Sequence, residues 1–81
     1  MVIVDYHPDF KRVYDKLDKS IKEKVEKLLA KIISKPEIGK PMRYTRKGTR
    51  ELYIKPFRLS YAFLPNENKI IILDLYHKDK Q

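Results

Sequence analysis

The spacing of apolar residues changes once along this chain, at a Pro- and Gly-containing loop over residues 35–41. Before the loop, one apolar stripe recurs at helical spacing: Ile21, Val25, Leu28, Leu29, Ile32 and Ile33. After it, apolar residues alternate with polar or small ones, as a half-buried strand requires: Phe57, Leu59, Tyr61 and Phe63. The chain therefore predicts helices in its first half and strands in its second.

Turn signals divide these two halves into elements. We expect a strand over residues 2–6, a helix from Pro8 to about Leu17, and a second helix that ends before Ser34. Ser20 is the expected N-cap of this second helix, because Glu23 follows three residues later as in a capping box. Four strands are expected after the loop, at 42–45, 51–55, 57–63 and 69–76.

The order β-α-α-β-β-β-β predicts an α+β fold with a single domain over residues 1–81. We expect an N-terminal strand and a two-helix hairpin packed on one face of a mainly antiparallel, four- to five-stranded sheet. The strand over 69–76 is almost wholly apolar and should be central. The other face of the sheet should be open, and strand alternation places cations such as Arg58 there.

Composition narrows the class of protein. The chain is 42 % hydrophobic and 37 % charged and has no cysteine, which excludes disulfides, thiolate metal sites and cysteine nucleophiles. It shows neither a signal-peptide pattern nor an apolar run long enough to span a membrane. A cytoplasmic protein with no membrane association is the simplest expectation.

Positive charge is concentrated between residues 40 and 58. Seven cations oppose one anion, Glu51, so this stretch carries +6 of the total charge of +8. The cations are Lys40, Arg43, Arg46, Lys47, Arg50, Lys55 and Arg58. A basic surface built on a sheet offers fixed charges to a polyanion, and RNA or DNA is the expected partner.

Few recurrent chemistries fit these residues. The sequence has no phosphate-cradling glycine loop and no recognisable Ser-His-Asp set. Its two histidines, His7 and His77, are 70 positions apart, so we expect neither a metal site nor a cofactor. What remains is a set of cations interleaved with tyrosines. Such residues can hold phosphates and stack on unpaired bases, and a metal-free ribonuclease needs the same types.

Four sequence patterns together resemble the RelE/ParE superfamily of toxins from type II toxin–antitoxin systems. They are Gly39-x-Pro41-x-Arg43, Arg50-Glu-Leu-Tyr-Ile-Lys55, Phe57-Arg58-Leu59-Ser60-Tyr61 and the apolar strand that ends in Tyr76-His77-Lys78. The resemblance covers nearly the whole chain, including the helical hairpin. It implies an endoribonuclease that cuts messenger RNA on the ribosome, without metal, through attack of the 2′-hydroxyl on the neighbouring phosphorus. It also implies a cognate antitoxin as partner.

The resemblance assigns roles by position. Arg58 matches the strand arginine that contacts the scissile phosphate, and Lys55 and Arg50 match basic residues that stabilise charge or shift protons. His77 and Lys78 match the C-terminal acid–base group, and Tyr76 is a candidate for stacking. Apart from the resemblance, Arg46, Lys47 and Arg50 flank a predicted hairpin turn and are expected to attract RNA phosphates. Arg43 belongs to the same basic surface and is a further candidate for RNA binding.

This sequence departs from the RelE pattern after the last strand. Many RelE-type toxins place a catalytic tyrosine there, whereas this sequence stops at Gln81, so either His77 takes the proton-transfer role or the activity differs.

Two further functions remain open. ParE-type toxins share the fold and inhibit DNA gyrase, and a basic module can bind RNA without cutting it. Arg58 can also simply pair with Glu51.

Overall fold

The computed structural model describes residues 2–41 and 48–77. Its helices are α1 (Pro8–Asp15) and α2 (Lys19–Ser34), and a short 3-10 helix spans Pro65–Glu67. Its strands are β1 (Ile3–Tyr6), β2 (Lys40–Pro41), β3 (Thr49–Ile54), β4 (Phe57–Leu64) and β5 (Lys69–His77). The element order and the α+β class are as predicted.

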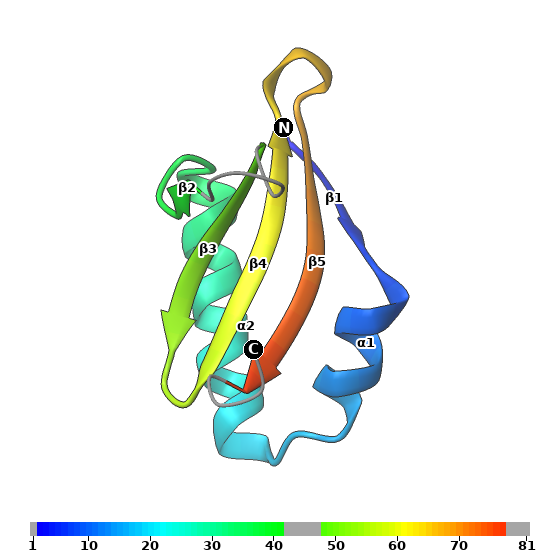
Figure 1. Ribbon diagram of the computed structural model, residues 1–81, viewed down its shortest axis with the longest axis vertical. Helices are drawn as coiled ribbons and strands as arrows, with labels where there is room; N and C mark the ends of the chain where they lie inside the picture. The colour runs from blue at the N-terminus through cyan, green and yellow to red at the C-terminus, as the bar shows by residue number, and fades with distance from the viewer. Residues whose placement is uncertain (1, 42–47, 78–81) are drawn as a thin grey trace.

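The five strands form one sheet in the order β1-β5-β4-β3-β2 (Figure 1). β1 runs parallel to β5, and the other three pairings are antiparallel. β5 is therefore flanked on both sides, which agrees with its apolar sequence. In Figure 1, α2 lies behind β3 and β4, and no helix or strand of the described residues covers the opposite face of these strands, which is turned toward the viewer.

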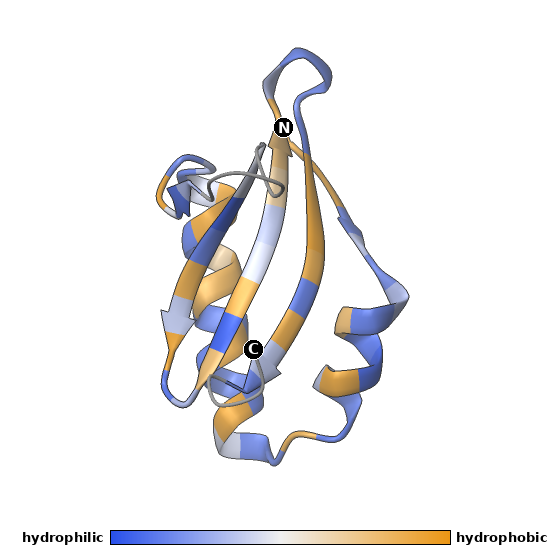
Figure 2. Cartoon of the chain, viewed as in Figure 1, coloured by the Kyte–Doolittle hydropathy of each residue, from blue (hydrophilic) through white to orange (hydrophobic). Residues whose placement is uncertain are grey.

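The core lies between the helices and the sheet. Among the described residues, eight hydrophobic side chains are at most 3 % exposed: Phe10 from α1, Val25 and Ile32 from α2, Leu59 and Tyr61 from β4, and Ile70, Ile72 and Leu75 from β5. Burial of each such aliphatic side chain stabilises the fold by about 1.5–3 kcal/mol. Figure 2 shows the apolar colouring that runs along most of β5, the strand that contributes most to this core.

A β-bulge in β5 decides which residues of that strand face the core. The pairing with β4 shifts between Ser60, which lies opposite Asp74, and Tyr61, which lies opposite Ile72. One extra residue in β5 reverses the alternation of side chains at that point. Ile72 and Leu75 are both buried for this reason, although they are three positions apart.

Two local predictions are wrong. Asp18, and not Ser20, caps α2: its Oδ1 accepts a hydrogen bond from the Ile21 N–H at 2.9 Å, and the Ser20 hydroxyl donates to the same oxygen. The helix begins at Lys19, two residues earlier than expected, which places Ser20 in its first turn. The predicted loop over 35–41 also contains β2, because Lys40 and Pro41 pair with Glu51 and Arg50. The strand expected over 42–45 lies outside the described residues.

No helix in the described part of the chain is long and apolar enough to cross a membrane.

Candidate functional site

Strand pairing assigns the candidate residues to the two faces of the sheet. Residues directly opposite each other in a ladder project to the same face. Arg58 lies opposite Tyr53 on one side and opposite Tyr76 on the other, so these three residues share a face. Glu51 is two residues before Tyr53 and projects to the same face, as does Lys40, which pairs with Glu51. This is the face that the helices leave open.

Glu51, Arg58 and Tyr76 form a hydrogen-bonded group that we term the open-face cluster. Arg58 Nη1 donates to Glu51 Oε1 at 3.1 Å, and the Tyr76 hydroxyl donates to Glu51 Oε2 at 2.5 Å. The Glu51 side chain is only 14 % exposed, whereas that of Arg58 is 33 % exposed. The carboxylate thus occupies the interior of the cluster, and the guanidinium lies nearer to solvent.

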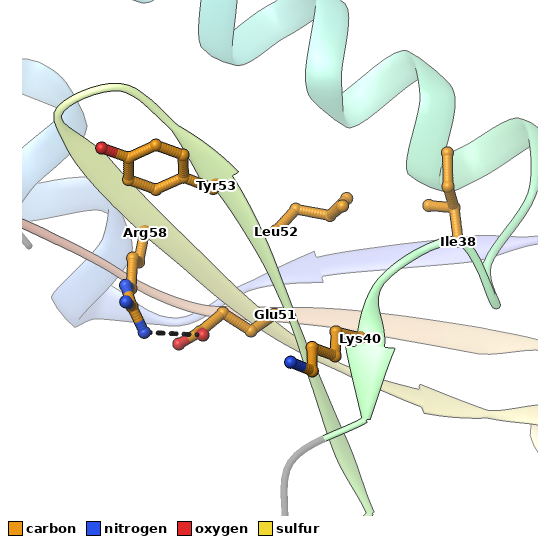
Figure 3. Close-up of a pocket in the computed structure, with 6 residues that line it drawn as sticks. All are labelled: Ile38, Lys40, Glu51, Leu52, Tyr53 and Arg58. Carbon is orange, nitrogen blue, oxygen red and sulfur yellow. Dashed lines mark hydrogen bonds and ion pairs between the residues drawn. The ribbon is translucent and has the colours of Figure 1, made fainter.

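A hollow of about 480 Å³ lies beside the open-face cluster, along the edge of β3 (Figure 3). β2 pairs only with Arg50 and Glu51, so the edge of β3 beyond Glu51 is not covered by β2. The hollow is lined by Ile38, Lys40, Glu51, Leu52, Tyr53 and Arg58. Its volume is in the range of small-molecule sites. Two cations, a carboxylate and the half-exposed ring of Tyr53 therefore surround a space that can receive a nucleotide.

The charge around the cluster is balanced among the described residues. Lys40 and Arg58 are the cations on this part of the open face, and Glu51 and Asp74 are the anions. The described strands add one further cation to this face, Lys69, which lies opposite Leu64 and is paired with Asp5 at 3.0 Å, so positive charge is not concentrated there. Arg43, Arg46 and Lys47, the three predicted RNA-binding cations, and Lys78 lie outside the described residues.

Arg50 lies on the opposite, helix-facing side of the sheet, opposite Tyr61. Its Nη1 donates to the carbonyl oxygens of Glu37 at 3.0 Å and Gly39 at 2.8 Å. The buried Tyr61 hydroxyl accepts from the Gly39 N–H and donates to the Pro36 carbonyl oxygen, both at 2.8 Å. We term this arrangement the loop clasp, because Arg50 and Tyr61 hold the α2–β2 loop against the sheet.

Burial shapes the loop clasp in two further ways. It raises the pKa of the Tyr61 phenol, and the Gly39 N–H and the positive charge of Arg50 oppose that rise. A Cβ atom on Gly39 would lie 2.6 Å from the Tyr61 hydroxyl oxygen and 2.8 Å from Cε1 of its ring. Only glycine fits at this position without a shift of the loop or of the ring.

His77 also lies on the helix-facing side. It pairs with Phe57, and the two rings meet edge to face with centroids 5.6 Å apart. Lys55 is exposed in the turn between β3 and β4. The structure therefore brings Arg58 together with Tyr76, but it places Arg50 and His77 on the other face of the sheet.

Glu51 is the residue that sequence reasoning weighed only as an ion-pair partner. Glu51 and Tyr53 are two positions apart and therefore share a face of β3. Because a short hairpin joins β3 to β4 and sets Tyr53 opposite Arg58, the sequence could have placed Glu51 on the face of Arg58. Its contact with Tyr76 depends on the β4–β5 register and could not be read in this way. Among the described residues, no three histidine, aspartate or glutamate side chains gather closely enough to hold a metal ion.

Comparisons with known proteins converge on one group. A family model described as the ParE toxin of type II toxin–antitoxin system, parDE, matches residues 4–81. No curated protein sequence matches significantly. Three similar solved structures are complexes: E. coli RelBE, RelBE2 from Mycobacterium tuberculosis, and archaeal RelE–RelB from Pyrococcus horikoshii.

The fold similarity to these structures extends over nearly the full length of both chains. The E. coli RelBE match has a TM-score of 0.82 at 14 % identity and covers 95 % of this chain and 96 % of the other. The M. tuberculosis match has a TM-score of 0.82 at 26 % identity, with 96 % and 94 % covered. The P. horikoshii match has a TM-score of 0.78 at 15 % identity, with 99 % and 98 % covered.

Proposed function

Because the chain belongs to the RelE/ParE superfamily of toxins from type II toxin–antitoxin systems, we propose that it is an endoribonuclease that cleaves messenger RNA on the ribosome, in the cytoplasm and without a metal ion. The observation that carries the proposal is the open-face cluster beside a nucleotide-sized hollow. Cleavage through the 2′-hydroxyl leaves a 2′,3′-cyclic phosphate and a 5′-hydroxyl.

Each side chain around the hollow has a role in this proposal. Arg58 holds the scissile phosphate and stabilises the charge that develops on it, since a guanidinium forms strong charge-assisted hydrogen bonds to phosphate oxygens. Tyr53, which is 51 % exposed, offers a ring face for an unpaired base. Lys40 lies on the same face and adds attraction for the RNA backbone.

The remaining basic residues support RNA binding by general electrostatic attraction. Lys55 is in the β3–β4 turn, and Arg43, Arg46, Lys47 and Lys78 add to the positive charge of the chain. Arg50 contributes by holding the α2–β2 loop that carries Ile38 and leads to Lys40. His77 remains a proposed proton-transfer group on the basis of the resemblance alone, because its ring packs on Phe57.

A cognate antitoxin is the proposed protein partner. The similar structures from E. coli, M. tuberculosis and P. horikoshii are toxin–antitoxin complexes, which supports this assignment. We propose that the antitoxin places acidic and apolar side chains over the open face and the helices, and so excludes RNA from Arg58.

Inhibition of DNA gyrase is a second candidate function. The match over residues 4–81 to the ParE toxin model favours it. A gyrase inhibitor acts by binding a protein and has no need of a group that contacts a scissile phosphate. Toxicity would then survive the loss of Arg58.

The test is primer extension on messenger RNA after induction of the wild type and three variants: Arg58→Ala, His77→Ala and, as a matched control, Arg12→Ala. Arg12 is a largely exposed arginine on α1, remote from the open face. The proposal predicts defined cuts in the wild type and Arg12→Ala that disappear in Arg58→Ala. Growth arrest with intact messages would instead favour gyrase, and persistence of the cuts in His77→Ala would remove His77 from proton transfer.

A further inference from the structure

Glu51 occupies a position that phosphate binding alone does not explain. A carboxylate next to Arg58 opposes the approach of an anionic backbone, and a site that only held RNA would bind it more tightly without this charge. Glu51 is nevertheless the least exposed member of its ion pair, at 14 %, and both of its oxygens accept hydrogen bonds. Its orientation is thus fixed from two sides, by β4 and by β5.

We propose that Glu51 is the catalytic residue that accepts the proton of the 2′-hydroxyl, an inference that rests on the proposed endoribonuclease function. Tyr76 acts as a positioning residue through its hydrogen bond to Oε2. The resemblance assigns neither role to these positions of the chain.

The geometry supports this role through Arg58. A guanidinium carries five N–H donors and can hold a carboxylate and a phosphate oxygen together. Glu51 Oε1 is 3.1 Å from Arg58 Nη1, and a phosphate oxygen bound to the same guanidinium would lie at about 2.8 Å from it. The carboxylate and the phosphate then lie within about 6 Å of each other, so the 2′-hydroxyl of the nucleotide that precedes the phosphate can reach Glu51.

The location of the other candidate base strengthens the assignment. His77 lies on the helix-facing side of the sheet, opposite Phe57, whereas Glu51 lies on the face of Arg58 and lines the same hollow. A carboxylate has about four acceptor sites on its two oxygens, so the hydrogen bonds from Arg58 and Tyr76 do not exhaust its capacity.

The proton of the 2′-hydroxyl moves to the Glu51 carboxylate, and the 2′ oxygen forms a bond to phosphorus. The bond between phosphorus and the 5′ oxygen breaks, and its electron pair stays on that oxygen. A water molecule donates a proton to the 5′ oxygen, and the resulting hydroxide takes the proton from Glu51. The products are a 2′,3′-cyclic phosphate and a 5′-hydroxyl, and the enzyme is regenerated.

The decisive experiment measures single-turnover cleavage of an end-labelled messenger RNA bound to ribosomes by purified toxin. The variants are Glu51→Gln, Glu51→Ala and the control Asp74→Asn, which removes a charge from the same face of β5, opposite Ser60. We expect Glu51→Gln to cleave at least about 100-fold more slowly while Asp74→Asn retains the wild-type rate. Binding of the RNA should be unchanged or tighter in Glu51→Gln, because a negative charge near Arg58 is lost.

Two readouts separate proton transfer from a structural effect. The wild-type rate should rise with pH along an acid limb that is absent in Glu51→Gln. Added formate should restore part of the rate of Glu51→Ala, because a small carboxylate can occupy the vacated space.

Tyr76→Phe should lower the cleavage rate and leave the dissociation constant for RNA unchanged. Thermal unfolding of each variant, measured first, establishes that it is folded.

Each contrary result has a defined meaning. If Glu51→Gln cleaves at the wild-type rate or faster, the inference is overturned and the endoribonuclease function stands, with Glu51 only a competitor for Arg58. A slow Glu51→Ala that formate does not rescue, with an unchanged acid limb in Glu51→Gln, also overturns it. If the wild type cleaves no RNA on ribosomes, the proposed function fails and the inference fails with it.

Discussion

Arg50 and Arg58 come from the same basic stretch of the chain, but their side chains project from opposite faces of the sheet. In the loop clasp, Arg50 holds two backbone carbonyl oxygens of the α2–β2 loop on the helix-facing side. In the open-face cluster, Arg58 holds the side-chain carboxylate of Glu51 beside a hollow. A backbone carbonyl cannot leave its donor unless the chain moves, whereas a carboxylate can share its donor with an incoming anion.

This difference separates structural cations from those that can bind a ligand. The number of positive charges between residues 40 and 58 overstates the phosphate-binding capacity of the surface, because the guanidinium of Arg50 is engaged with the protein backbone. The type of partner, and not the type of residue, distinguishes the two arginines. The contrast can be tested by matched substitutions in the loop clasp and the open-face cluster.

The largest difference in lost folding stability should appear between Tyr61→Phe and Tyr76→Phe. Tyr61→Phe removes the partner of the Gly39 N–H and of the Pro36 carbonyl, and each unsatisfied backbone group costs about 1–3 kcal/mol. We expect the free energy of unfolding to fall by about 2–4 kcal/mol. Tyr76→Phe, in a half-buried position, should cost less than about 1 kcal/mol. Urea unfolding followed by circular dichroism measures both, and equal losses would refute the contrast.

The stability lost on substitution by alanine should differ by a smaller amount between Gly39 and Gly48. Gly39→Ala forces a Cβ against the Tyr61 ring, and overpacking of this kind costs about 2–3 kcal/mol. Gly48→Ala meets no atom within 4 Å but places an L-residue at a φ of +95°, at a cost of about 1 kcal/mol. Adding Tyr61→Phe to Gly39→Ala removes the clashing oxygen, so the losses in the double variant should be less than additive. Strict additivity would show that the loop moves instead.

A still smaller difference in stability is expected between Arg50→Met and Arg58→Met. Arg50→Met leaves two carbonyl oxygens without a charged donor, and we expect a loss of about 1–2 kcal/mol. Arg58→Met removes an ion pair whose guanidinium is one-third exposed, and the expected loss is below about 1 kcal/mol. Chemical denaturation at matched ionic strength provides the comparison. A larger loss for Arg58→Met would mean that Glu51 is a structural partner.

The smallest expected effect is a dependence on alkaline pH. Burial raises the pKa of Tyr61 in the folded state, so the unfolded chain loses this proton first as the pH rises. The contribution of the protonated Tyr61 phenol to the free energy of unfolding is complete below the unfolded pKa of about 10. It is lost as the pH rises through the higher folded pKa. The stability difference between the wild type and Tyr61→Phe should therefore be smaller at about pH 11 than at about pH 8. A constant difference would show that the phenol titrates normally.

The sequence predicted the architecture because the architecture follows from local periodicity. The apolar stripe of α2 and the alternation in β4 are short-range patterns, and they specify the order of elements and the side of the sheet that is buried. The cap of α2 was missed by two positions because Asp18 and Ser20 are both good caps, and the choice between them depends on where the first turn closes.

The candidate site was only partly predictable because it depends on register. The turn at Lys55 and Pro56 joins β3 to β4, and a shift of one residue there would exchange the faces of Arg58 and its neighbours. The bulge between β4 and β5 likewise decides that Tyr76, and not His77, projects to the face of Arg58. No spacing in the sequence specifies the position of that bulge.

The place of β5 in the sheet has a consequence for the synthesis of the toxin. β5 is the last strand in chain order, yet it lies between β1 and β4 and carries three buried residues. A nascent chain that ends before Lys69 has no partner for β1 and lacks Tyr76 beside Glu51. Translation must therefore pass through nearly all of the described chain before a folded toxin exists, and a chain stalled before Lys69 should remain sensitive to protease.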